Sequence, residues 1–235
     1  MSNWNEGVLD RSNTKLFTRN ILRNVYVWMT IALGITAVVS YGMSLDTKMV
    51  LGLYQSGIIY GVLIAQVIIA IALGGFIMKM PPLVAVAVFA VYAVLMGVGL
   101  SGIFIVYQIG SIFKAFFSAA VMFGVMSAYG IFTKRDLTSW GTFLGMAVIG
   151  LVIASVINMF IHAGPLDMII SIVAIIVFTG LTAYDTQKIK QMSASFGDKI
   201  NDADYIRLSI NGALMLYIDF INIFVSLLRI FGDRR

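Results

Sequence analysis

Seven apolar stretches, each about twenty residues long, constrain what this chain can fold into. They cover residues 25–45, 57–78, 82–104, 111–132, 138–161, 166–187 and 206–229. About 20 apolar residues are needed for a helix to cross a bilayer, and hydrocarbon offers no partner for unpaired backbone N–H or C=O groups. A membrane β-barrel would instead show alternating segments of about 10 residues. We therefore predict an all-α membrane protein with seven transmembrane helices.

The composition excludes a soluble domain. Of the 235 residues, 60% are hydrophobic and only 11% are charged, whereas soluble domains carry about 25% charged residues. The net charge of +5 does not indicate nucleic-acid binding, because the basic residues are dispersed over short loops and tails. The absence of cysteine excludes disulfides and thiolate metal sites.

Lysine and arginine placement predicts the orientation. With the N-terminus inside, eleven basic residues fall on the inner side and five on the outer side, which is the bias of cytoplasmic loops. Residues 1–24 then form a cytoplasmic tail, without a cleaved signal peptide, and residues 25–235 form the membrane domain. The basic C-terminal tail would also suit a re-entrant seventh segment, but the length of this segment favours a full span with the C-terminus outside.

Two aspartates lie inside the last two apolar stretches, Asp185 and Asp219. An ionisable group at membrane depth is costly and is usually functional. At about 100° per residue, the seventh segment carries a polar stripe on one helix face. Its members are Asn211, Asp219, Asn222 and Ser226. A looser stripe on the sixth segment contains Ser171, Thr182 and Asp185. We expect both stripes to face the interior of the helix bundle.

Two carboxylates facing each other in a medium of low dielectric constant do not both stay ionised without a cation, so the pair is predicted to share a proton. Such a pair responds to pH. It is also the beginning of a hard-cation site, although Ca²⁺ takes about six to eight oxygen ligands. The structural alternative is that each aspartate only satisfies its neighbours, with Asp185 paired to Lys188 one turn away.

The last two segments carry a family resemblance. The runs 180–190 (GLTAYDTQKIK) and 213–229 (ALMLYIDFINIFVSLLR) resemble the Bax inhibitor-1 (transmembrane Bax inhibitor motif) family, bacterial branch. Three shorter pieces agree with it: residues 99–102 (GLSG), residues 133–137 (TKRDL), and Asn158. The resemblance extends over essentially all seven segments.

The resemblance implies a seven-helix fold whose last helix is wrapped by the other six. It also implies a pH-sensitive calcium leak gated by aspartates that match Asp185 and Asp219. Arg229 matches a basic residue that latches to an acidic residue of the second helix; here that position is Gln66, so a latch would be a weaker hydrogen bond. Other bacterial members resemble regulators of a membrane-bound ATP-dependent protease that use the N-terminal tail. The bacterial branch implies an inner membrane.

Two protease classes compete with this interpretation. Two membrane aspartates suit an intramembrane aspartyl protease, but no Gly-x-Gly precedes Asp219. The Gly-x-Ser-Gly pattern around Ser101, with His162 as the only histidine, suits a rhomboid-type serine protease. A glycine-rich turn and a loop histidine are the simpler explanation of that pattern.

We therefore predict a non-enzymatic protein, a pH-sensitive calcium leak channel or proton-coupled cation exchanger. The alternative is a non-transporting regulator that binds a membrane-bound protease or another membrane partner. Asp185 and Asp219 form the predicted gate and the predicted calcium ligands. The predicted supporting polar residues are Asn211, Asn222, Ser226, Thr182 and Asn158. No cofactor is expected beyond calcium as the permeant or bound ion, and the partners are the lipid bilayer, calcium and protons.

Overall fold

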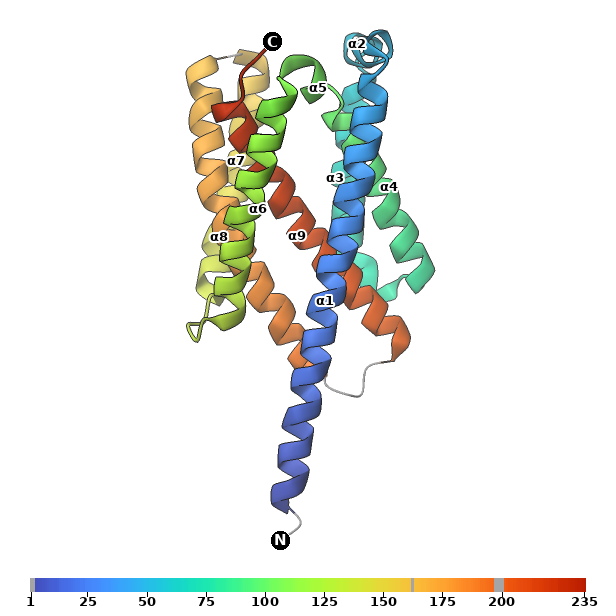
Figure 1. The fold of residues 1–235 in the computed structure, drawn as a ribbon, viewed down its shortest axis with the longest axis vertical. Coiled ribbons are helices and arrows are strands. Elements are labelled where there is room, and N and C mark those ends of the chain that lie inside the picture. The colour runs from blue at the N-terminus through green and yellow to red at the C-terminus, as the bar shows by residue number, and fades with distance from the viewer. Residues whose placement is uncertain (1–2, 162, 197–200) are drawn as a thin grey trace. The chain divides into compact units, whose positions relative to one another are not determined.

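The computed structural model describes residues 3–161, 163–196 and 201–235, and the side chains from residue 16 onward within these ranges. Figure 1 labels the helices in chain order. The long helices are α1 (Asn3–Ser44), α3 (Ile58–Phe76), α4 (Pro82–Leu100), α6 (Ile109–Phe132), α7 (Thr138–Ile161), α8 (Gly164–Phe196) and α9 (Asp202–Phe231). The short ones are α2 (Thr47–Gln55), η1 (Ile77–Lys79) and α5 (Ile103–Val106).

Seven helices of the described part are long and apolar enough to cross a membrane, which confirms the predicted number. Most boundaries lie within about four residues of the sequence prediction, and two differ by more. The first candidate span begins at Leu16, and the sixth continues to Phe196. The sixth extends because no glycine or proline interrupts residues 185–196, so the helix continues into its polar end. The short helices α2 and α5 were not predicted; Asp46 caps α2 by accepting a hydrogen bond from Met49 N–H.

The first of two compact units contains α1, α2, α3, η1 and α4, together with residues 189–215 from the end of α8 and the start of α9. Helix α1 packs along α4. The Thr36 hydroxyl donates to the Ala93 carbonyl of α4 at 2.9 Å. At the other end of α4, the Arg207 guanidinium of α9 donates to the Met80 carbonyl at 2.7 Å and pairs with Asp204 at 2.6 Å. These contacts attach both α1 and the start of α9 to α4 and the turn before it.

The second unit contains α5, α6, α7, α8 up to Lys188, and α9 from Leu216 onward. Aromatic rings join α6 to α9: Phe116 lies 5.3 Å from Phe220 and 6.2 Å from Phe224, measured between ring centroids. Among the seven candidate spans, α9 has the largest buried share, 61% of its most apolar window against 6–39% for the others. Such burial is expected of the helix that the resemblance implies to be central.

The C-terminal residues are held at the start of α6. Arg235 N–H donates to the Val106 carbonyl at 2.9 Å, and Gln108 N–H donates to the Asp233 carbonyl at 3.0 Å. Within the second unit, α9 therefore packs along α6 from Phe123 toward its start, and the chain ends where α6 begins. Helix α9 is one continuous helix of 30 residues. This continuity supports a full seventh span, because a re-entrant segment would have to turn back within the membrane.

Candidate functional site: a buried aspartate pair

Helices α8 and α9 bring Asp185 and Asp219 together within the second unit. The side chains are 9% and 3% exposed, and the two carboxyls lie close enough for the charge of one to affect the other. One carboxyl oxygen of Asp219, Oδ2, is buried and has no hydrogen-bond partner among the described residues. A buried carboxyl oxygen without a donor is costly unless a proton or a cation reaches it. The pair is therefore suited to exchanging one for the other.

A direct Asp185–Lys188 ion pair does not explain Asp185. The charge of Lys188 does act on Asp185, but its ammonium lies over the Tyr184 ring, 5.7 Å from the centroid. Ion pairs within the described ranges include Arg207–Asp204 and Arg229–Asp167, and no Asp185–Lys188 pair is seen there. Because α8 continues to Phe196, Asp185 lies well inside this helix and not at its end.

The polar residues of the two stripes are mostly satisfied by their own helices. The Asn222 amide donates to the Ile218 carbonyl at 2.8 Å, and the Thr182 hydroxyl donates to the Phe178 carbonyl at 2.8 Å. Ser226 is 6% exposed. Because the Thr182 hydroxyl has a single donor, this bond leaves none for the aspartate pair, whereas the Asn222 amide keeps a second N–H.

Two predicted polar residues remain, Asn211 and Asn158. Asn211 is half-buried on the part of α9 that belongs to the first unit. Asn158 accepts a hydrogen bond from Ala163 N–H at 3.1 Å, which fixes the connection between α7 and α8. Its observed contact is therefore structural, and its supporting role at the gate stays a prediction.

Helix α6 contacts residues of α8 that flank Asp185 in the sequence, through side chains that the sequence analysis missed. The Thr186 hydroxyl lies 3.4 Å from the Ser127 hydroxyl, and both side chains are buried. A Cβ added at Gly130 would overlap the Ala183 carbonyl oxygen, so α6 and α8 approach closely there. Serine, threonine and glycine are common in membrane helices, and single ones give no signal in a sequence.

The loop between α6 and α7 is attached to α8 beside the pair. The Gln187 amide donates to the Arg135 carbonyl at 2.9 Å and accepts from Leu137 N–H at 2.9 Å. Hydrogen bonds from the Thr138 hydroxyl and then from its backbone N–H lower the pKa of Asp136 below its usual value. The loop is therefore held by Gln187 on one side and by the first turn of α7 on the other.

Gln66 and Arg229, the predicted latch, each have a partner within their own unit. The Gln66 amide donates to the Leu95 carbonyl at 2.8 Å, and Arg229 pairs with Asp167 at 3.4 Å with both side chains about 40% exposed. Asp167, in the first turn of α8, is an acidic partner that the sequence analysis did not name. The Gln66–Arg229 latch stays a prediction.

Ser101 does not have the geometry of a nucleophile. Its side chain is fully buried, and its hydroxyl donates to the Val98 carbonyl at 2.7 Å. His162, the proposed catalytic base of that reading, lies outside the described residues. This burial favours the interpretation of residues 99–102 as a structural turn.

Comparisons with known proteins find matches along most of the chain. The family model described as "Inhibitor of apoptosis-promoting Bax1" matches residues 18–235. The inner membrane protein YbhL of Escherichia coli K12 is 44% identical over 218 residues, covering 91% of this chain and 92% of the relative. The protein RP147 of Rickettsia prowazekii is 38% identical over 240 residues, covering 100% of both. A membrane protein of Streptococcus pyogenes, SpyM3_0260, is 36% identical over 211 residues, covering 88% of this chain and 90% of the relative.

Proposed function

Because this chain belongs to the family of the inhibitor of apoptosis-promoting Bax1, we propose that it is a pH-sensitive pathway for cations, above all calcium, across a bacterial inner membrane. Asp185 and Asp219 are its gate. The similarity to an inner membrane protein of Escherichia coli supports the location. The main support for this gate is that the two aspartates are buried and affect each other electrostatically. In addition, Asp219 Oδ2 has no hydrogen-bond donor among the described residues.

The chemistry of the gate follows from burial. When the two carboxyls share a proton, one donates to the other and the pair holds α8 and α9 together. When both are ionised, they repel each other or bind a cation. Acidification therefore changes the gate, because protonation removes the repulsion.

A permeating ion fits this site better than a resident one. Within the described residues, no group of three or more acidic or histidine side chains could hold a metal. Two carboxylates supply fewer oxygens than the about six to eight that Ca²⁺ takes, so water and backbone oxygens complete the coordination only in passing. Weak, incomplete coordination is what conduction requires.

Calcium flux into proteoliposomes, measured from acidic to alkaline pH with an entrapped calcium dye, tests the proposal. We expect Asp185→Asn and Asp219→Asn to change the flux and to flatten its pH dependence. The matched control is Asp202→Asn, since Asp202 lies exposed in the first turn of the same helix as Asp219. If the three variants and the parent share one flux and one pH profile, the gate is rejected. An entrapped pH dye separates the two transport modes, because only an exchanger moves protons against calcium.

The regulator alternative predicts a different result. Helix α1 begins at Asn3, well before the candidate span at Leu16, so the helix reaches beyond the membrane segment. A parent protein without calcium flux, combined with loss of the cellular phenotype when residues 1–14 are removed, would favour a protein partner over transport.

A further inference from the structure

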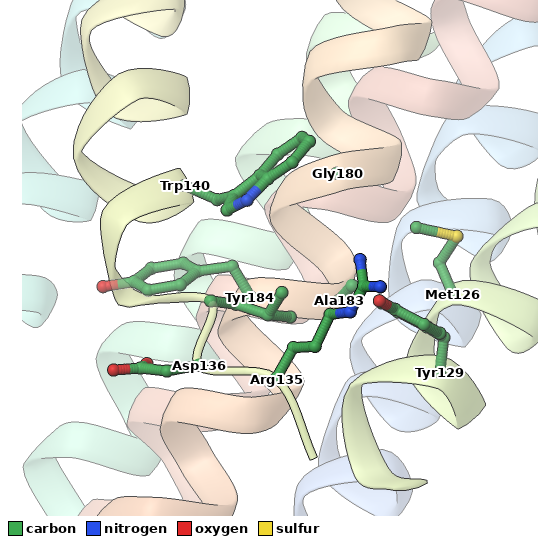
Figure 2. A pocket seen from close by; sticks show the side chains of 9 residues that line it. Met126, Tyr129, Arg135, Asp136, Trp140, Gly180, Ala183 and Tyr184 are labelled. Atoms are coloured by element: carbon green, nitrogen blue, oxygen red, sulfur yellow. The ribbon is translucent and has the colours of Figure 1, made fainter. Parts of the chain in front are cut away.

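A cavity of about 230 Å³ opens in the second unit at the end of α6. It lies between the last turns of α6, the loop 133–137, the first turn of α7 and the middle of α8, and its lining includes Tyr129, Arg135, Trp140 and Tyr184. Figure 2 shows Trp140 on one side of the cavity and Tyr129 on another, with Arg135 rising between them. The cavity thus combines three aromatic side chains with one cation, Arg135, and one carboxylate, Asp136.

The depth of the cavity is that of a membrane interface. Helix α6 ends at Phe132 and α7 begins at Thr138, so the loop between them lies where two candidate spans leave the hydrocarbon. Trp140 is 62% exposed and Tyr129 is 44% exposed. Amphipathic aromatic rings of this kind concentrate at the level of the lipid headgroups. An occupant of the cavity would therefore lie among headgroups.

The cation in the cavity has no internal partner. Neither an ion pair nor a side-chain hydrogen bond of Arg135 is found within the described ranges, since only its backbone is bonded. Figure 2 shows the Asp136 carboxylate directed away from the Arg135 guanidinium, and Thr138 already donates two hydrogen bonds to it. Lys188, over the Tyr184 ring, adds further positive charge nearby. Thr138 therefore occupies the carboxylate of the cavity, and the Arg135 guanidinium is left to bind an anion.

The walls of the cavity are held in place before any ligand arrives. Gln187 bonds the backbone of Arg135 and of Leu137 to α8. The absence of a side chain at Gly141 leaves the space that the Tyr184 ring fills. A site held in this way binds with a smaller loss of conformational freedom.

We propose that this cavity binds the phosphate headgroup of an anionic phospholipid. The guanidinium fork matches the geometry of a phosphate, the Tyr129 hydroxyl supplies a further donor, and Trp140 covers the glycerol. The volume is below the about 300–1,000 Å³ of pockets for drug-sized ligands, so it admits a headgroup while the acyl chains lie along the exposed faces of α6 and α7. The predicted cytoplasmic side of the loop is where basic pockets between membrane helices bind anionic headgroups. This site is separate from the proposed cation gate.

Fluorescence of Trp140 reports on the cavity directly. The chain has three tryptophans, Trp4, Trp28 and Trp140, so replacing the first two by phenylalanine leaves one reporter. The protein is reconstituted in vesicles in which either phosphatidylglycerol or phosphatidylcholine carries brominated, quenching acyl chains. From the quenching we expect phosphatidylglycerol to bind beside Trp140 about fivefold more strongly than phosphatidylcholine. This ratio is the effect of one basic residue at an anionic surface.

Two variants of matched charge separate a built site from diffuse attraction. Arg135→Gln removes the cation of the cavity, while Lys134→Gln removes the neighbouring exposed charge, which does not line it. We expect the preference for phosphatidylglycerol over phosphatidylcholine to disappear in Arg135→Gln and to persist in Lys134→Gln. Equal loss in both variants, or no preference in the parent, overturns the proposal. Relief of quenching by millimolar glycerol phosphate or inorganic phosphate assigns the cavity to a soluble phosphate and overturns the lipid.

Discussion

Gly130 allows α6 to approach α8 beside the aspartate pair, and its replacement by alanine tests how tightly that approach positions the gate. A methyl group at Gly130 would overlap the Ala183 carbonyl oxygen and come within 3.1 Å of the Thr186 Cβ atom. A backbone carbonyl inside a helix cannot rotate away, so the two helices must separate. Ala183 and Thr186 flank Asp185 in the sequence, so we expect this separation to shift Asp185 relative to Asp219.

The magnitude follows from two opposing effects. Overpacking costs about 1–3 kcal/mol, whereas alanine in place of glycine inside a helix stabilises by about 1 kcal/mol. Gly124, on the same helix, is exposed and has no atom within 4 Å of an added Cβ, so Gly124→Ala gains the helix preference without the overlap. The difference in unfolding free energy between the two variants therefore isolates the overpacking, about 1–3 kcal/mol.

Thermal unfolding in one detergent under identical conditions measures this difference. For a chain of this size about 1 kcal/mol corresponds to about 2–4 °C in Tm, so we expect Gly130→Ala to unfold about 2–12 °C below Gly124→Ala. Calcium flux of the same variants reports whether the pair is displaced. Equal Tm values for the two alanine variants would refute the inference that α6 and α8 touch through Gly130.

Two further predictions concern the loop between α6 and α7. Gln187→Leu leaves the buried Leu137 N–H without its partner, so we expect a loss of about 1–3 kcal/mol and faster hydrogen exchange at residues 133–137; unchanged exchange would show that Gln187 does not hold the loop. Asp136 has a lowered pKa because Thr138 donates hydrogen bonds to its ionised form. The ionised carboxylate therefore stabilises the folded protein fully above the unfolded pKa of about 4. This stabilisation is lost as the pH falls through the lower pKa of the folded state. Asp136→Ala should therefore lower the Tm at neutral pH, with the difference from the parent closing in acid; a difference independent of pH would contradict this assignment.

Much of the fold could be predicted from the sequence because the bilayer imposes a strong and local rule. Seven apolar stretches predict seven helices, and the structure confirms the number. The rule is weaker at helix ends, where polar residues continue a helix without a break in hydropathy. The end of α8 at Phe196 and the short helix α2 are the cases in which local propensity and capping decided the boundary.

The two aspartates could be identified from the sequence, but the residues packed around them could not. Asp185 and Asp219 are conspicuous in a sequence because charge at membrane depth is rare. Their neighbours are inconspicuous: Ser127, Gly130 and Gln187 belong to residue types that occur throughout membrane helices and loops. Only packing shows that two of them lie on α6 against α8.

The sequence by itself determined that the chain is an all-α membrane protein with two acidic groups in its last two helices, because composition and hydropathy act residue by residue. Tertiary structure decided which groups meet. It brought Asp185 near Asp219, paired Arg229 with Asp167 and left Arg135 facing a cavity with no internal partner among the described residues. These pairings depend on how helices that are far apart in the chain pack together. The hydropathy pattern of one helix does not specify which residues of another helix it will contact.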